Sequence, residues 1–187
     1  MAMGAMAGGA AMKYQDCVEP AQALDETSED WEAEPRLCEA NINPVTGLAT
    51  DYLNHFNEAI MLLEMLSSCP DCLDDFLAWR PLGYREHFAA SRFKGRDLAI
   101  AAYDAADPNL RKSLDALAGS MTAMLEATRV ALRSGMPPQA GGLIAEAAAA
   151  WLKPLVARAG SLINGDPDIK PNVAATPQVV VDGLLKR

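Results

Sequence analysis

A seam of leucine and methionine side chains between Asp107 and Gly135 is the feature that most constrains the fold of this 187-residue chain. Asp107-Pro108 has the residue types of a helix N-terminus, and Gly135 followed by two prolines is typical of a helix end. Apolar residues recur between them at alternating steps of four and three, which places them on one side of an α-helix that other helices must cover. They are Leu110, Leu114, Leu117, Met121 and Met124.

Helical spacing recurs on both sides of this segment. A stripe from Tyr52 to Leu66 predicts a helix over about 50–67, and a second apolar pattern predicts one over about 141–162 that Pro154 should kink or split. Short helices are predicted over 71–79, 84–93, 96–105 and 176–185. No segment shows sustained alternation with period two. The prediction is an all-α fold, a helical bundle of three long helices plus several short ones.

Negative charge is concentrated near the start of the chain. Residues 1–50 hold nine acidic residues against two basic ones, whereas the other 137 residues hold 16 against 14. The apolar residues of this region are scattered rather than periodic. We therefore predict a disordered or extended acidic arm over 1–45 and a single α-helical domain over 46–187. The domain lacks the basic footprint of a nucleic-acid-binding protein.

Targeting signals are also absent from the sequence pattern. No uninterrupted apolar run approaches the roughly 18–20 residues that span a bilayer, and the start of the chain lacks the charged and leucine-rich regions of a signal peptide. The alanine-rich composition is typical of a GC-rich bacterium. We expect a cytoplasmic bacterial protein whose thiols stay reduced.

The stretch from Asp51 to Phe93 concentrates the residues with chemical potential, including both histidines of the chain and seven of its eleven aromatic residues. Asp51, His55 and Glu58 are spaced to share one helix face, so they are secondary candidates for a metal site or for a general base tuned by carboxylates. The alternative interpretation is a histidine at the core boundary that a neighbouring carboxylate satisfies.

The spacing Cys69-Pro70-Asp71-Cys72 is a secondary candidate for a redox pair, or for zinc together with Cys17 and Cys38. The surrounding aspartates raise thiol pKa values and oppose thiolate chemistry. Structural thiols are the alternative that these neighbours favour.

A basic patch over 80–96 interleaves arginines with aromatic side chains, a combination that suits a protein surface or an anionic ligand. The competing interpretation is that the aromatic rings face inward and only the charges are solvated. A further hypothesis is that the acidic segment 16–39 folds back over this patch. The candidate partner-binding residues are Trp79, Arg80, Tyr84, Arg85, His87, Arg92 and Phe93.

The sequence contains no nucleotide-binding, serine-hydrolase or zinc-protease motif. We expect a non-enzymatic accessory or regulatory protein, of adaptor type, that binds a protein partner and no cofactor. Two alternatives stay open: a metal- or thiol-dependent bundle using the residues above, and an enzyme or small-ligand binder with a pocket between the 50–67 helix and Tyr84–Phe93. The Leu110–Met124 seam could be covered within one chain or across a homodimer.

Overall fold

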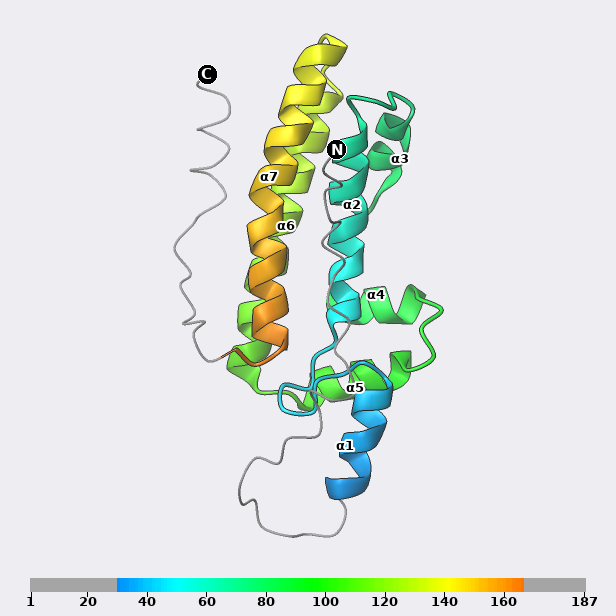
Figure 1. Ribbon diagram of the computed structural model, residues 1–187, viewed down its shortest axis with the longest axis vertical. Coiled ribbons are helices and arrows are strands. Elements are labelled where there is room, and N and C mark those ends of the chain that lie inside the picture. Colours follow the sequence, from blue (N-terminus) through cyan, green and yellow to red (C-terminus); the bar gives the residue numbers. More distant parts are fainter. Residues whose placement is uncertain (1–29, 167–187) are drawn as a thin grey trace, which may run out of the picture.

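The computed structural model describes residues 30–166, and their side chains from residue 35 onward (Figure 1). The elements follow one another as α1 (Asp30–Glu39), the 3₁₀ helix η2 (Thr50–Leu53), α2 (Asn54–Met65), α3 (Cys72–Ala78), α4 (Tyr84–Ala90), α5 (Arg96–Ala105), α6 (Pro108–Leu132) and α7 (Pro138–Ile163). Within 30–166 there is no strand, only an isolated bridge between Ile42 and Ala49. The all-α prediction is confirmed.

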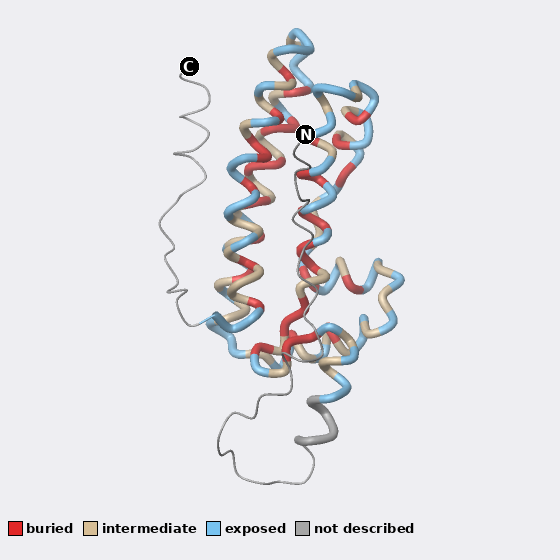
Figure 2. Tube along the Cα trace, viewed as in Figure 1, coloured by how far each residue is buried: buried red, intermediate tan, exposed pale blue. Residues whose placement is uncertain are grey.

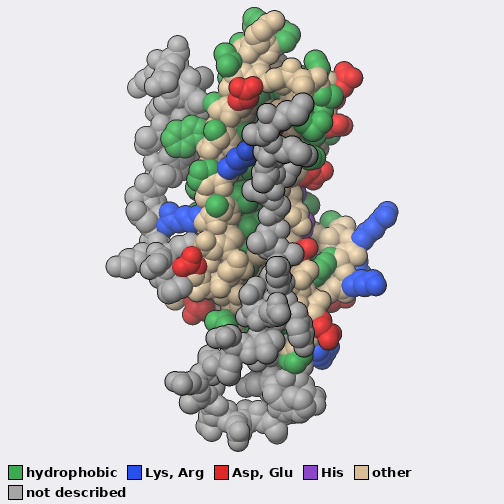
Figure 3. All heavy atoms as spheres, in the orientation of Figure 1, with side chains coloured by type: hydrophobic (Ala, Val, Ile, Leu, Met, Phe, Trp, Pro, Cys, Tyr) green, Lys and Arg blue, Asp and Glu red, His purple; other side chains and the backbone are tan. Residues whose placement is uncertain are grey.

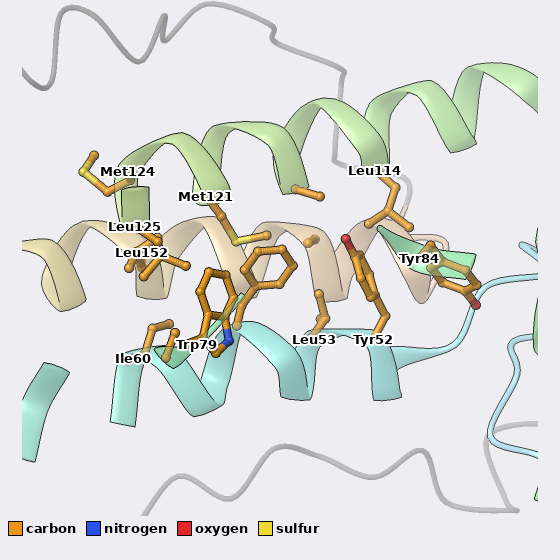
Figure 4. Close-up of a cluster of buried hydrophobic side chains, with 14 of the residues drawn as sticks. Tyr52, Leu53, Ile60, Trp79, Tyr84, Leu114, Met121, Met124, Leu125 and Leu152 are labelled. Carbon is orange, nitrogen blue, oxygen red and sulfur yellow. The ribbon is translucent and has the colours of Figure 1, made fainter. Parts of the chain in front are cut away.

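The core lies among α2, α6 and α7, which run side by side, with α7 in contact with both of the others (Figure 1). Buried residues line the inner sides of these helices, while the outer sides are exposed (Figure 2). Leu53, Ile60, Met121, Leu125 and Leu152 point into this shared interior (Figure 4). Removing such side chains from water is the main favourable contribution to folding.

α6 begins as its sequence predicts. The Asp107 carboxylate accepts hydrogen bonds from the backbone N–H groups of Asn109 at 2.8 Å and Leu110 at 3.0 Å, and Pro108 occupies the first helical position. The cap satisfies N–H groups that have no partner within the helix. The helix ends at Leu132, and Gly135 then adopts a φ of 75° in the turn toward α7.

α7 starts earlier than the sequence pattern indicates and is not split at Pro154. It begins at Pro138, because a proline at the first helical position has no N–H to satisfy. Pro154 lies on the exposed side, where water can satisfy the carbonyl that loses its helical partner. By length and composition α7 is apolar enough to cross a membrane, and one of its sides packs against α2 and α6.

The region before α2 differs from the predicted extended arm. Residues 30–39 form α1, and the following loop buries Ile42 and Leu48 completely. The Asn43 side chain accepts from the backbone N–H of Thr46 at 3.1 Å, and the Thr46 hydroxyl donates to the Ile163 carbonyl, at the end of α7, at 2.6 Å. The loop is ordered by these bonds and by two apolar anchors that show no periodicity. Residues 1–29 of the predicted arm lie outside the described residues, as does the predicted helix 176–185.

Gly47 should be irreplaceable in this loop. Its φ is 69°, and a Cβ there would stand 2.9 Å from the Ala102 carbonyl oxygen. Gly47→Ala is expected to lower the free energy of unfolding by roughly 1–3 kcal/mol, measured by urea unfolding. Gly119→Ala is the matched control, because a Cβ at that exposed helical position meets nothing and should be neutral or stabilising. Equal midpoints for the two variants would contradict this account of the loop.

Candidate functional site

A ladder of aromatic and histidine rings crosses the interior between α2, α4 and α5. At one end the His55 ring stacks on Trp79 with centroids 4.5 Å apart, and at the other end Tyr84 stacks on Tyr103 at 4.4 Å. Intermediate centroid distances are 5.1–5.8 Å. Ring pairs at such separations stabilise each other beyond the area that they bury. In order, the ladder consists of Trp79, His55, His87, Tyr52, Tyr84 and Tyr103.

His55 is a core residue with 7% of its surface exposed. Its Nε2 accepts a hydrogen bond from the Leu82 backbone N–H at 3.1 Å, and its own carbonyl accepts from Trp79 Nε1 at 3.2 Å. Burial, reinforced by repulsion from His87, lowers the pKa of His55 to about 4. The imidazole is therefore neutral at physiological pH, and its Nε2 lone pair is already engaged by a backbone donor.

The carboxylates of Asp51 and Glu58 act electrostatically on His87 rather than on His55. Burial lowers the pKa of His87, while the Asp51 carboxylate and, more weakly, Glu58 act in the opposite direction. Burial also raises the pKa of Asp51. Asp51 belongs to η2, which runs directly into α2, the helix that carries His55 and Glu58. Within residues 30–166, no three His, Cys, Asp or Glu side chains are arranged to hold a metal ion.

Arg129 is a buried cation that the sequence interpretation missed. Only 6% of the residue is exposed. Its Nη2 donates to the Trp79 carbonyl at 2.5 Å, its Nη1 lies 3.2 Å from Glu126 Oε1, and its guanidinium carbon is 6.0 Å from the centre of the Trp79 ring. The available signal was its position, four residues after Leu125 and three before Leu132, on the apolar side of α6.

The cysteine pair sits at the start of α3, with Cys72 buried and Cys69 half-buried, and both are free thiols. A hydrogen bond to Cys69, together with burial and the nearby aspartates, raises the pKa of Cys72 to about 11. Cys72 is therefore a protonated thiol at neutral pH, which does not favour nucleophilic or metal-binding chemistry. Cys17 lies outside the described residues.

The predicted partner-binding residues divide into an inner and an outer set. Trp79 and Tyr84 are buried in the ladder, so the expectation that they contact a partner directly does not fit their positions. Tyr84 and Phe88 are one turn apart and both face inward, whereas Arg85 faces solvent. His87 and Phe93 are half-buried, and Arg80 and Arg92 are exposed.

Two details concern the edges of this segment. Arg80 Nη1 donates to the carbonyls of Leu77, Ala78 and Trp79 at 3.0–3.1 Å, which satisfies the C-terminal end of α3. At the other edge, a Cβ at Gly95 would lie 2.8 Å from Ala40 Cβ, so the chain just after α1 contacts the 80–96 segment. Of the acidic segment 16–39 that was expected to cover this patch, residues 16–29 lie outside the described residues.

A cleft of about 630 Å³ opens where α4, α5 and the first turns of α6 meet at Tyr103. The guanidinium carbons of Arg85 and Arg111 lie 5.9 and 5.7 Å from the centre of the Tyr103 ring. The Tyr103 hydroxyl donates to the Asp115 carboxylate at 2.8–2.9 Å, and burial together with Asp115 raises the pKa of Tyr103 to about 12. We call this site the Tyr103 cleft. Its lining residues are Gly83, Tyr84, Arg85, Glu86, Tyr103, Pro108, Arg111, Lys112 and Asp115.

Glu86 and Asp115, the acidic residues of the Tyr103 cleft, accept hydrogen bonds from the protein, whereas Arg111 and Lys112 form no ion pair within residues 30–166. Glu86 accepts from the Gly83 backbone N–H at 2.9 Å, and Asp115 accepts from Tyr103. Arg85 is ion-paired with Asp104. Within 30–166, Arg111 and Lys112 form no ion pair, and Arg111 Nε is buried without a hydrogen-bond partner. Sequence reasoning found Arg85 but not Arg111 or Lys112, because the start of α6 has the pattern of a solvated turn.

Comparison of this chain with known proteins found no relative. No protein-family model matches the sequence, and no curated protein or solved structure is significantly similar to it.

Proposed function

We propose that this chain is a non-enzymatic accessory or regulatory protein that binds another protein, and that the Tyr103 cleft receives an acidic segment of that partner. The observation that carries the proposal is the state of Arg111. Its guanidinium lies over the Tyr103 ring at the wall of the cleft, and its buried Nε has no acceptor. A carboxylate entering the cleft would supply one.

The chemistry of the surrounding side chains favours a carboxylate over other ligands. A guanidinium presents several N–H donors in a plane and binds carboxylates with paired hydrogen bonds. Lys112, adjacent to Arg111 and exposed, adds a second cation that is not ion-paired within the described residues. Glu86 and Asp115 already accept hydrogen bonds from the protein, so they hold the walls of the cleft in place.

The exposed arginines of the predicted patch would extend the contact beyond the cleft. Arg85 lies at its edge, and Arg80 and Arg92 face solvent at the two ends of the α4 region. Buried Trp79 and Tyr84 support this surface from behind through the ladder. In this proposal the partner-binding role therefore belongs to Arg80, Arg85, Arg92, Arg111 and Lys112, with His87 and Phe93 half-exposed between them.

A labelled hexaglutamate peptide tests the proposal directly in the full chain. Fluorescence anisotropy is expected to show binding that weakens about tenfold or more in Arg111→Gln, because a hydrogen bond to a charged group contributes ~1.5–3 kcal/mol. Arg133→Gln is the matched control, since it removes the same charge from an exposed position beyond the other end of α6.

Three results would contradict the proposal. One is that hexaglutamate does not bind at all. A second is that Arg111→Gln and Arg133→Gln weaken it equally, which would indicate general charge attraction. The third is that a hexaglutamine peptide binds as tightly as hexaglutamate, since the interaction would then not depend on carboxylates.

A further inference from the structure

Cys69 and Cys72 occupy the first and last positions of the turn that joins α2 to α3. The Cys69 N–H donates to the carbonyl of Met65, the last residue of α2, at 2.8 Å, and the Cys72 N–H donates to the Cys69 carbonyl at 3.1 Å. A bond of the second kind closes a four-residue turn and brings its two outer Cα atoms to within about 7 Å. A disulfide joins Cα atoms that are about 4.4–6.8 Å apart, so the backbone of this turn suits one.

The two cysteine side chains meet across the turn and differ in exposure. The Cys72 S–H donates a hydrogen bond to the Cys69 sulfur, so the two sulfur atoms are neighbours. Only 6% of Cys72 is exposed, whereas Cys69 is half-buried and solvent reaches it. A reagent in solution therefore meets Cys69 first, and Cys72 lies behind it in a position to attack the Cys69 sulfur.

The surroundings of the pair are negatively charged. The carboxylates of Asp71 and Asp75 act electrostatically on Cys72, and Asp74 is exposed in the first turn of α3. None of the three forms an ion pair within residues 30–166. Acidic side chains are visible along the surface over α3 (Figure 3). Carboxylates without a countercharge attract a cationic reactant and repel an anionic one.

We propose that Cys69 and Cys72 are a dithiol site that a small, positively charged disulfide oxidises to an intramolecular disulfide. The Cys69 thiolate attacks one sulfur of the oxidant R–S–S–R, forms a mixed disulfide with it and releases the first thiolate RS⁻. Cys72 then attacks the Cys69 sulfur, forms the bond between the two cysteines and releases the second RS⁻. The protons of the two cysteines end on two molecules of R–SH, so the protein is oxidised and the small disulfide is reduced.

The order of the two steps follows from the state of Cys72. Its thiol is protonated at neutral pH and shielded from solvent, so it does not begin the reaction. In the mixed disulfide its sulfur lies against the Cys69 sulfur, and an attack within one molecule needs no encounter from solution. The carboxylates that keep Cys72 protonated also favour a cationic oxidant, so the site selects its oxidant by charge.

Two small disulfides of opposite charge test the proposal in the full chain at pH ~8 and low ionic strength: cystamine, which is cationic, and glutathione disulfide, which is anionic. After acid quenching and alkylation of the remaining thiols, cleavage after glutamate separates the pair from Cys38. Mass spectrometry is expected to show that the peptide containing Cys69 and Cys72 loses two hydrogen atoms and takes up no alkylating agent. Cystamine should produce this change about tenfold faster than glutathione disulfide, or more.

Variants of the two cysteines separate their roles. Cys72→Ser should stop at the mixed disulfide on Cys69, because no second thiol is present to displace it. Cys69→Ser should form the mixed disulfide on Cys72 about tenfold more slowly than Cys72→Ser forms it on Cys69, because Cys72 is shielded.

The charge preference has its own pair of variants. Asp75→Asn removes one carboxylate beside the thiols and should lower the preference for cystamine about twofold or more. Asp97→Asn is the matched control, because it removes an exposed carboxylate from the first turn of α5 and should keep the preference.

Any of three results would overturn the proposal. One is that the peptide keeps both thiols in cystamine, or stops at the mixed disulfide as Cys72→Ser does, since the two cysteines would then not pair. A second is that cystamine and glutathione disulfide react at equal rates. The third is that Asp97→Asn lowers the preference as much as Asp75→Asn, which would assign it to the net charge of the whole chain. This reaction is independent of ligand binding at the Tyr103 cleft, so failure of one does not affect the other.

Discussion

Arg129→Ala is expected to lower the free energy of unfolding by roughly 2–4 kcal/mol, the largest effect of any single truncation considered. The variant removes the 2.5 Å hydrogen bond to the Trp79 carbonyl and the packing of the arginine stem inside α6. The carbonyl retains the donor from Arg80 at 3.1 Å, which keeps the loss below that of a fully unpaired group. Urea unfolding at neutral pH measures the effect.

Two further variants separate the contributions at this position. Arg133→Ala removes an exposed arginine one turn later and should change stability by less than about 0.5 kcal/mol. Arg129→Met keeps most of the buried volume and also removes Arg129 Nε, which has no hydrogen-bond partner. It should therefore lose less than half as much as Arg129→Ala. If Arg129→Ala unfolds at the same urea concentration as Arg133→Ala, the bond to Trp79 does not stabilise the fold.

Acidification should destabilise the protein through His55, by up to about 3 kcal/mol between pH ~6.5 and pH ~4. The pKa of His55 is lowered from 6.5 to about 4 in the folded protein, so within this window the unfolded chain binds the extra proton and the folded chain does not. The stabilisation is complete above the unfolded pKa and is lost as the pH falls toward the folded one. The lowered pKa of His87 acts in the same direction, whereas the raised pKa of Asp51 offsets part of the loss at the acidic end.

Urea unfolding at several pH values, for the natural chain and for His55→Gln, checks this expectation. Glutamine cannot titrate, yet its amide oxygen can accept from the Leu82 N–H as the imidazole does. The slope of stability against pH should therefore be much reduced in His55→Gln, while His87→Gln should keep most of it. An unchanged slope in His55→Gln would assign the acid sensitivity to another group.

The helices were predictable where their signals are local. Asp107-Pro108 predicts the start of α6 because a cap and a helical proline need only their nearest neighbours, and the 110–124 seam faces the core as its spacing indicates. The same is true of α2, whose stripe contains the buried Phe56, Ala59 and Leu63. By contrast, the end of α7 that packs against Thr46 could not be inferred, since periodicity does not identify a contact partner.

Residues 40–45, the first part of the loop over 40–49, fall within the predicted extended arm because the order of this loop depends on distant residues. Ile42 and Leu48 are isolated apolar residues among prolines and polar side chains, a composition that predicts disorder. The Ala49 N–H donates to the Tyr84 hydroxyl at 2.8 Å, and a Cβ at Gly47 would contact the Ala102 carbonyl of α5. Neither contact could be inferred from the amino-acid sequence of the loop, because Tyr84 and Ala102 lie far along the chain.

Of the residues that line the Tyr103 cleft, the sequence pattern indicated those near residue 84 but not those at the start of α6. The alternation of arginines and aromatic rings near residue 84 shows that a charged surface lies over a packed one, and this is what Arg85 and Tyr84 form. The partners that complete the cleft, Arg111 and Lys112, come from the start of another helix, which the stacking of Tyr84 on Tyr103 brings alongside. Only the tertiary fold brings these residues together.

The hydrogen bond between Thr46 and Ile163 also constrains when the loop before α2 can close during translation. The two residues are 117 positions apart, so Thr46 leaves the ribosome long before its acceptor is made. A nascent chain that lacks α7 has no acceptor for this hydroxyl, and α2 has no helix to pack against along that side. Local helices can form early, but closure of the loop must await the last described helix. Completion of the native fold is therefore an event that follows translation of α7, and until then the growing polypeptide exposes the apolar interior formed by α2, α6 and α7.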